Sequence, residues 1–99
     1  MSGAWVYILE CSDGSFYTGL TKQEDPEGRV WEHNTRVFPD SYTSTRLPVK
    51  LVYAEHFELV SDAIVAERRI KGWSRAKKVA MMNGNWRQVQ LLANRRGGN

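Results

Sequence analysis

Five side chains of this 99-residue sequence have the chemistry to bind an anion and to move a proton. Two of them are phenols, Tyr7 and Tyr17, which stand ten residues apart. Arg29 and His33 are four residues apart, the spacing of neighbours on one helix face. A guanidinium can contact a phosphate through two hydrogen bonds, and an imidazole can pass on a proton. On spacing alone, the same pair is also an ordinary feature of a helix surface.

The fifth side chain, Glu67, is an isolated carboxylate on a predicted helix. It lies three residues after Ile64 and three before Ile70, so its helix face is partly apolar, an unusual place for a lone acid. A hard divalent cation such as Mg²⁺ would explain it, because such an ion needs only one or two carboxylates beside substrate phosphates. An ion pair with Lys71, at the i+4 position, explains it equally well.

Three strands and four helices are predicted to position these residues. The strands are rich in β-branched and aromatic side chains and cover residues 5–9, 16–21 and 49–57. Each helix follows a residue that can cap its first turn: 26–34 after Asp25, 63–71 after Ser61, 75–82 after Ser74, and a last one after Asn85. Residues 36–48 are predicted to form a loop. The order β-β-α-β-α-α-α indicates an α+β fold, a small antiparallel sheet with helices packed on it.

The turn of the first hairpin decides whether the two tyrosines face each other. A two-residue turn at Asp13 and Gly14 places Tyr7 and Tyr17 on opposite faces. A three-residue turn with a left-handed Gly14 pairs Tyr7 with Gly19 and brings both phenols to one face, with room for a ligand beside Gly19. The sequence leaves both registers open.

The charge is divided unevenly along the chain. The net charge is +3, but residues 61–99 carry nine basic and two acidic side chains, whereas residues 1–60 carry five and nine. A basic half suits a polyanion such as nucleic acid, although Lys and Arg are also ordinary helix-surface residues. A single cysteine excludes an internal disulfide and a Cys-based zinc site. Because residues 5–9 are too short an apolar run to cross a membrane, we expect a cytoplasmic protein.

Together these segments resemble the GIY-YIG nuclease domain, in particular its small single-domain bacterial members. The matching segments occur in the family's order: Trp5-Val6-Tyr7, Tyr17-Thr18-Gly19, residues 28–34, residues 42–53, residues 63–71, Trp73-Ser74-Arg75 and Lys77-Lys78. Trp5 and Thr18 stand where the motif name has Gly and Ile. The match covers residues 4–80 of a single domain, 1–99, and leaves residues 81–94 as a C-terminal helical extension. Two residues, Asn83 and Asn85, are candidates for an Asn that many members carry near the domain's end.

The resemblance implies a three-stranded antiparallel sheet flanked by helices and an endonuclease that hydrolyses phosphodiester bonds, in DNA rather than RNA. Glu67 would hold Mg²⁺ or Mn²⁺, and Arg29 would hold the phosphate. Tyr7 or Tyr17 would position or deprotonate the attacking water, and His33 would relay the proton. Since a free tyrosine has a pKa near 10, a tyrosine base needs positive charge nearby, from Arg29, the metal or His33.

Five basic residues are predicted to grip the nucleic-acid backbone: Arg46, Lys71, Arg75, Lys77 and Lys78. Because 99 residues leave little surface for sequence readout, we expect structure-selective or weakly sequence-selective cleavage, or action with a protein partner. We expect a monomer, since so small a domain needs every apolar residue, including Trp86, Val89 and Leu92. Two alternatives stay open: a non-catalytic nucleic-acid-binding module that stacks bases on its aromatic residues, and a subunit of a larger repair or processing assembly.

Overall fold

The structure is a computed structural model that describes residues 3–35 and 40–97, the last five of these by their backbone alone. Residues 36–39 of the predicted loop lie outside the described residues, as do the side chains of Arg95 and Arg96. The elements follow the predicted order: β1 (Ala4–Glu10), β2 (Phe16–Thr21), α1 (Glu27–Asn34), a 3₁₀ turn η1 (Tyr42–Thr45), β3 (Lys50–Phe57), α2 (Val60–Lys71), α3 (Arg75–Met82) and α4 (Trp86–Gly97). The predicted α+β class is confirmed.

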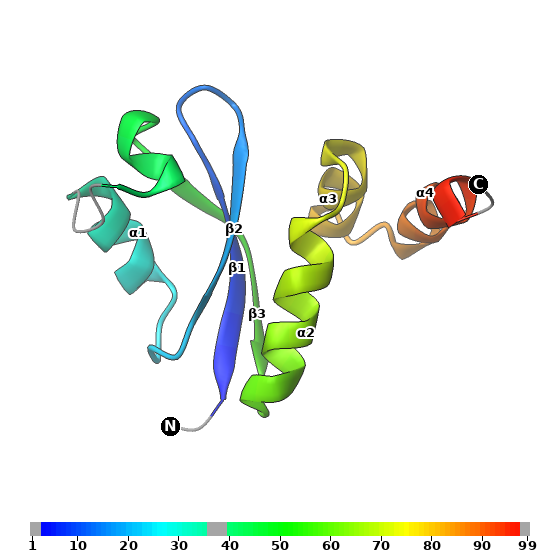
Figure 1. Cartoon of the computed structure of the whole chain (residues 1–99), viewed down its shortest axis with the longest axis horizontal. Helices are drawn as coiled ribbons and strands as arrows, with labels where there is room; N and C mark the ends of the chain where they lie inside the picture. Colours follow the sequence, from blue (N-terminus) through cyan, green and yellow to red (C-terminus); the bar gives the residue numbers. More distant parts are fainter. Residues whose placement is uncertain (1–2, 36–39, 98–99) are drawn as a thin grey trace.

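The sheet lies between two helical layers. Its strands run antiparallel in the order β2-β1-β3, so β1 is central and β2 is an edge strand. Figure 1 shows α1 on one side of the sheet and α2 on the other, with α3 and α4 continuing from α2. Because strand side chains alternate between faces, Val6 and Ile8 pack in a core with α2, whereas Tyr7 and Leu9 pack toward α1. Among the described residues, no helix is long and apolar enough to span a bilayer.

The first hairpin adopts the three-residue turn. The Cys11 amide donates to the Ser15 carbonyl at 2.8 Å, and Gly14 has a φ of 85°, in the left-handed region. The register places Tyr7 opposite Gly19 and Leu9 opposite Tyr17, so both phenols lie on the face that α1 covers.

Two helix starts agree with their predicted caps. The Ser74 hydroxyl accepts a hydrogen bond from the Lys77 amide at 3.2 Å at the start of α3. The Asn85 side chain accepts one from the Gln88 amide at 3.1 Å at the start of α4. Both helices begin where the sequence predicts, because each cap satisfies an amide of the first turn.

The other two helix starts differ from prediction. Ser61 is not a cap: α2 begins one residue earlier, at Val60, and the Leu59 carbonyl accepts the first amides of the helix. Asp25 lies one residue before the cap position, which Pro26 occupies. Its carboxylate still accepts a hydrogen bond from the Glu27 amide, at 2.9 Å.

The predicted apolar faces are only partly buried. In α2, Ile70 is 6% exposed, but Ile64 is 36% exposed. In α4, Val89 is 6% exposed and packs in the core beside α2 and α3, whereas Trp86 is 53% exposed. The expectation that Trp86 is buried within the monomer is therefore wrong, and Val89 attaches α4 to the domain.

Candidate active site

Four of the five predicted catalytic residues line one pocket on the α1 side of the sheet. The pocket has a volume of about 240 Å³ and is lined by Tyr7, Tyr17, Leu20, Arg29, His33 and Ser41. Tyr17 lies at its centre: its ring centroid is 6.5 Å from that of Tyr7 and 5.3 Å from that of His33. β1 and β2 supply the phenols, and one face of α1 supplies Arg29 and His33, as their spacing predicts.

Tyr7 lies directly over Gly19. A Cβ at Gly19 would be 2.5 Å from both the Cζ and the hydroxyl oxygen of Tyr7. The space beside Gly19, predicted to admit a ligand, is therefore filled by the Tyr7 phenol. Burial raises the pKa of Tyr7, and the neighbouring Tyr17 raises it further. The charge of Arg29 lowers it by less, and Glu32 and Glu67 add still smaller increases. Tyr7 is thus a neutral phenol at neutral pH, suited to donating a hydrogen bond.

Arg29 is held in place by Glu32, one helical turn away. The guanidinium Nη1 lies 3.2 Å from Oε1 of Glu32, and the same oxygen accepts a hydrogen bond from the Gln23 side chain at 3.2 Å. The Arg29 side chain is 27% exposed, so it reaches the pocket while its orientation is fixed. The i,i+3 spacing could have revealed Glu32 in the sequence. No sequence signal points to Gln23, which lies on the loop before α1.

His33 is buried and held by the loop that contains η1. Its Nδ1 forms a hydrogen bond with the Thr43 hydroxyl, which also bonds the Ser41 hydroxyl at 2.8 Å. Burial lowers the pKa of His33 and the Arg29 charge lowers it further, against an opposing effect of Glu32. His33 is therefore neutral at pH 7. It cannot be the source of positive charge near a tyrosine base, which was one of the three predicted possibilities. A neutral imidazole can instead accept a proton.

Asn34, the last residue of α1, ties the helix to the start of β3. Its side-chain amide donates to the Val49 carbonyl at 3.1 Å and accepts from the Val49 amide at 2.8 Å. Because Val49 is 4% exposed, these bonds satisfy backbone groups that water does not reach. Sequence reasoning missed this contact, which fixes the helix end beside His33.

Glu67 lies outside this pocket, on α2, which packs against the other face of the sheet. Its side chain is 16% exposed, and Oε2 is 3.4 Å from Nζ of Lys71, so the predicted ion pair is present. The charge of Glu67 is the smallest of the contributions that raise the pKa of Tyr7. Within residues 3–35 and 40–97, no group of three or more His, Cys, Asp or Glu residues could hold a metal ion.

Three of the five basic residues predicted to grip nucleic acid lie over aromatic rings of the chain. Arg46 lies 3.9 Å from the centroid of Tyr42, Arg75 lies 4.2 Å from that of Phe16, and Lys77 lies 4.2 Å from that of Trp73. Arg46 also pairs with Asp13 at 3.2 Å, and Arg75 donates to the Gly14 carbonyl.

The other two basic residues, Lys71 and Lys78, line a common pocket. Lys71 is exposed, whereas Lys78 is only 9% exposed.

A family model described as the GIY-YIG catalytic domain matches residues 3–80. The chain belongs to the GIY-YIG family. Relatives of this GIY-YIG domain include the UPF0213 protein of Syntrophus aciditrophicus, 44% identical over 85 residues that cover 86% of this chain and 95% of the relative. The UPF0213 protein of Staphylococcus aureus strain Mu3 is 45% identical over 82 residues, 83% of this chain and 96% of the relative.

Two solution NMR structures share the fold of this GIY-YIG domain. The UPF0213 protein BH0048 of Bacillus halodurans has a TM-score of 0.53 and 37% identity, with 82% of this chain and 83% of that chain covered. The protein EF2693 of E. faecalis has a TM-score of 0.57 and 35% identity, with 85% and 86% covered. The relatives assign the chain to the UPF0213 group of GIY-YIG proteins, and the structures confirm the predicted fold.

The candidates for the late Asn of the GIY-YIG domain lie away from the site. Asn83 and Asn85 are both exposed, in the turn between α3 and α4. Asn85 caps α4, and neither side chain lines the pocket around Tyr17.

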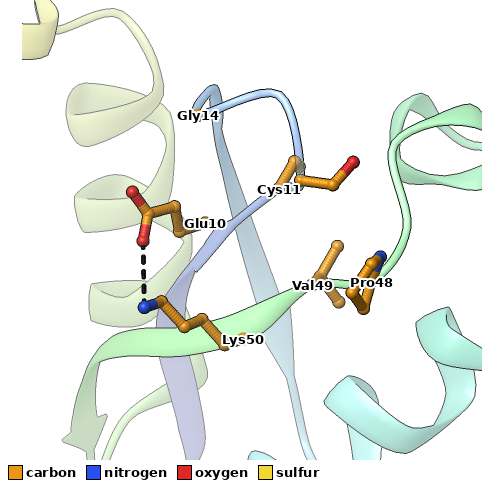
Figure 2. Close-up of a pocket in the computed structure, with 7 residues that line it drawn as sticks. Glu10, Cys11, Gly14, Pro48, Val49 and Lys50 are labelled. Carbon is orange, nitrogen blue, oxygen red and sulfur yellow. Dashed lines mark ion pairs between the residues drawn. The ribbon is translucent and has the colours of Figure 1, made fainter.

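A larger pocket of this GIY-YIG domain, about 420 Å³, lies beside the hairpin turn and the start of β3 (Figure 2). An ion pair of 3.4 Å between Glu10 and Lys50 joins the two strands at one side of it. Cys11 also lines the pocket, and burial raises the pKa of its thiol, which stays protonated at neutral pH. None of the predicted catalytic residues lines this pocket. It is therefore not part of the candidate site, although its volume is larger.

Proposed function

We propose that this GIY-YIG domain is a metal-dependent endonuclease that hydrolyses phosphodiester bonds in DNA. One observation carries the proposal: two phenols, a guanidinium and a neutral imidazole converge on one pocket. A module that only binds nucleic acid needs basic and stacking side chains. It does not need a buried imidazole beside one buried and one half-buried phenol.

Arg29 is the group that binds the phosphate to be cleaved. Its contact with Glu32 and the bond from Gln23 to the same carboxylate fix the guanidinium before substrate arrives. A fixed positive group stabilises the charge that builds on a phosphate in the transition state, without any reorganisation during the reaction. The Tyr7 phenol, kept neutral by burial, donates a hydrogen bond to the same phosphate.

His33 and Tyr17 handle the attacking water. The two rings are 5.3 Å apart between centroids, so both border the same part of the pocket. The Tyr17 hydroxyl orients the water, and the neutral His33 imidazole takes its proton. Thr43 holds the imidazole ring in one orientation through Nδ1, as a general base requires.

The donor set fits a divalent ion held by a single carboxylate. Glu67 is partly exposed, and its partner Lys71 is 60% exposed and can move aside. Glu67 would hold Mg²⁺ or Mn²⁺, hard cations that need only one or two carboxylates beside substrate phosphates. When bound there, such an ion would supply positive charge to offset the negative charge on the phosphate and the departing oxygen.

The substrate selectivity follows from the small size of the domain. A chain of 99 residues leaves little surface for sequence readout, and the pockets around Tyr17 contain phosphate-binding chemistry. We therefore propose cleavage that depends on DNA structure, or only weakly on sequence, by a monomer acting alone or with a protein partner.

The test is a cleavage assay with labelled single-stranded, duplex and branched DNA, in Mg²⁺ or in EDTA. We expect metal-dependent cleavage by the wild type and a loss of at least about 100-fold in both Arg29→Ala and Glu67→Ala. Glu58→Ala, which removes an exposed carboxylate from the turn before α2, is the matched control and should cleave like the wild type.

If none of these substrates is cleaved, the proposed nuclease activity is rejected. If DNA binding were then unchanged by Glu67→Ala, the domain would be a binding module on an inherited scaffold, or a subunit of a repair or processing assembly.

A further inference from the structure

A second pocket lies across Tyr17 from the candidate active site. It has a volume of about 290 Å³ and is lined by Phe16, Tyr17, Thr18, Tyr42, Lys71 and Lys78. Tyr17 also lines the catalytic pocket, so the two pockets share one wall. Phe16 packs with the core on the α2 side, whereas Tyr17 packs on the α1 side, so the second pocket lies at the outer edge of β2.

One buried polar group in this pocket lacks a partner in the part of the chain that the structure describes. Thr18 is 2% exposed, and its hydroxyl has no hydrogen-bond partner there. Burying a hydroxyl without a partner is costly. Lys78, which lines the same pocket, is 9% exposed and forms no ion pair with a described residue. A hydroxyl without a partner beside an ammonium therefore points to a ligand that accepts hydrogen bonds and carries negative charge.

The second lysine places this pocket beside Glu67. Lys71 lines the pocket with its side chain 60% exposed, and its Nζ is 3.4 Å from the Glu67 carboxylate. Burial lowers the pKa of Lys78, and the charge of Lys71 lowers it further. An anion bound between the two ammonium groups would offset their repulsion, so the pocket favours negative charge.

We infer that this pocket binds a phosphate group of the nucleic acid next to the phosphate that is cleaved. The inference rests on the proposed function, because it requires Arg29 to hold the scissile phosphate on the other side of Tyr17. Lys71 and Lys78 supply the charge, and the Thr18 hydroxyl donates a hydrogen bond to a phosphate oxygen. The rings of Phe16 and Tyr42 contact the attached nucleoside. The phosphate can be an internal diester or a terminal monoester, since both present the same oxygens.

The test measures binding of a fluorescent DNA strand to the whole chain in EDTA, at several salt concentrations, so that cleavage plays no part. We expect Lys78→Met to weaken binding about tenfold and to lower the salt-dependence slope by about one. Thr18→Val should weaken binding about threefold, as for loss of one hydrogen bond. The charge-matched control is Lys50→Met on β3, at the opposite edge of the sheet, which should leave binding within twofold of the wild type, a margin of about 0.4 kcal/mol.

Equal binding and equal slopes for Lys78→Met and Lys50→Met would overturn the subsite, even if the wild type cleaves DNA in Mg²⁺. Conversely, the expected losses with no cleavage in Mg²⁺ would support phosphate binding in this pocket, but would reject the nuclease and with it the position of the pocket beside a scissile phosphate. Thermal unfolding checks that Lys78→Met folds, and Thr18→Val carries the test if it does not. DNA strands with a 5′-phosphate or a 5′-hydroxyl show which kind of phosphate is bound. If Lys78→Met weakens binding only of the 5′-phosphorylated strand, the pocket binds a terminal phosphate. If it weakens binding of both strands, the pocket binds an internal phosphate.

Discussion

The two sides of the edge strand β2 differ in whether their polar side chains have hydrogen-bond or ion-pair partners. On the α1 side, Arg29 is paired with Glu32 and His33 is bonded to Thr43. On the α2 side, the described structure gives the Thr18 hydroxyl no partner, and its neighbour Lys78 forms no ion pair. The difference indicates that the α1 side is organised before substrate arrives, whereas the α2 side is completed by what binds to it.

The largest effect on cleavage is expected from Gly19→Ala. The added Cβ would be 2.5 Å from the Tyr7 ring, so Tyr7 must leave its place or the strand must shift. We expect cleavage to fall below detection and the free energy of unfolding to drop by about 1–3 kcal/mol, measured by urea denaturation. The control is Gly72→Ala, where the nearest atom is 3.7 Å away and φ is −85°. A Gly19→Ala protein as active as that control would show that Tyr7 need not lie over Gly19.

The next effect is expected from Asn34→Ala, which disconnects α1 from β3. Losing both bonds leaves the buried backbone groups of Val49 unsatisfied, at a cost of about 1–3 kcal/mol in the free energy of unfolding. Because His33 is the preceding residue, kcat should fall more than substrate affinity does. Asn83→Ala, at an exposed position after α3, should change neither quantity. An unchanged melting temperature in Asn34→Ala would mean that these two hydrogen bonds do not hold α1 against β3.

A matched pair of threonines compares the two sides directly. Thr43 and Thr18 are 0% and 2% exposed, but within the described residues only the Thr43 hydroxyl has hydrogen-bond partners, His33 and Ser41. Thr43→Val should lower the free energy of unfolding by about 1–3 kcal/mol, because it leaves His33 without that bond. Thr18→Val should be neutral or slightly stabilising, since it removes a buried hydroxyl that bonds nothing among the described residues. Equal losses in thermal unfolding would remove the distinction between the sides.

The smallest effect concerns pH. Since burial lowers the pKa of His33 below its ordinary 6.5, the unfolded chain binds more protons than the folded chain as pH falls below 6.5. Stability contributed by neutral His33 is therefore complete above pH 6.5 and is lost as pH falls through the folded pKa. Urea denaturation between pH 7.5 and pH 5, values chosen to bracket the ordinary pKa of histidine, should show a steeper decline in the wild type than in His33→Gln. Parallel declines would mean that His33 is not held neutral by its surroundings.

Much of the fold could be predicted because the signals are local. Ser74 and Asn85 mark helix starts through bonds to amides three residues on, and Gly14 permits the left-handed turn. The choice between the two hairpin registers was not local. Arg46, 33 residues from Asp13, pairs with that turn residue, and such a contact leaves no trace in the spacing of residues.

The sequence predicted which residues meet in the pocket better than it predicted which groups hold them there. Tyr7, Tyr17, Arg29 and His33 do meet, because strand and helix periodicities place them on facing surfaces. The groups that hold them could not be found the same way. Thr43 lies on a loop, and the burial of Lys78 depends on how α3 packs against β2, which no periodicity within α3 determines.

We propose that Arg29 and Glu67 act on one phosphate from opposite sides of β2, and a double-mutant cycle tests this most directly. Arg29→Lys and Glu67→Asp each keep the charge but change the geometry, so each should retain measurable single-turnover cleavage. If both residues act on the same transition state, the double variant should be slowed by less than the product of the two single effects. Losses that multiply would mean that Arg29 and Glu67 act independently, and would contradict a single site across the edge of the sheet.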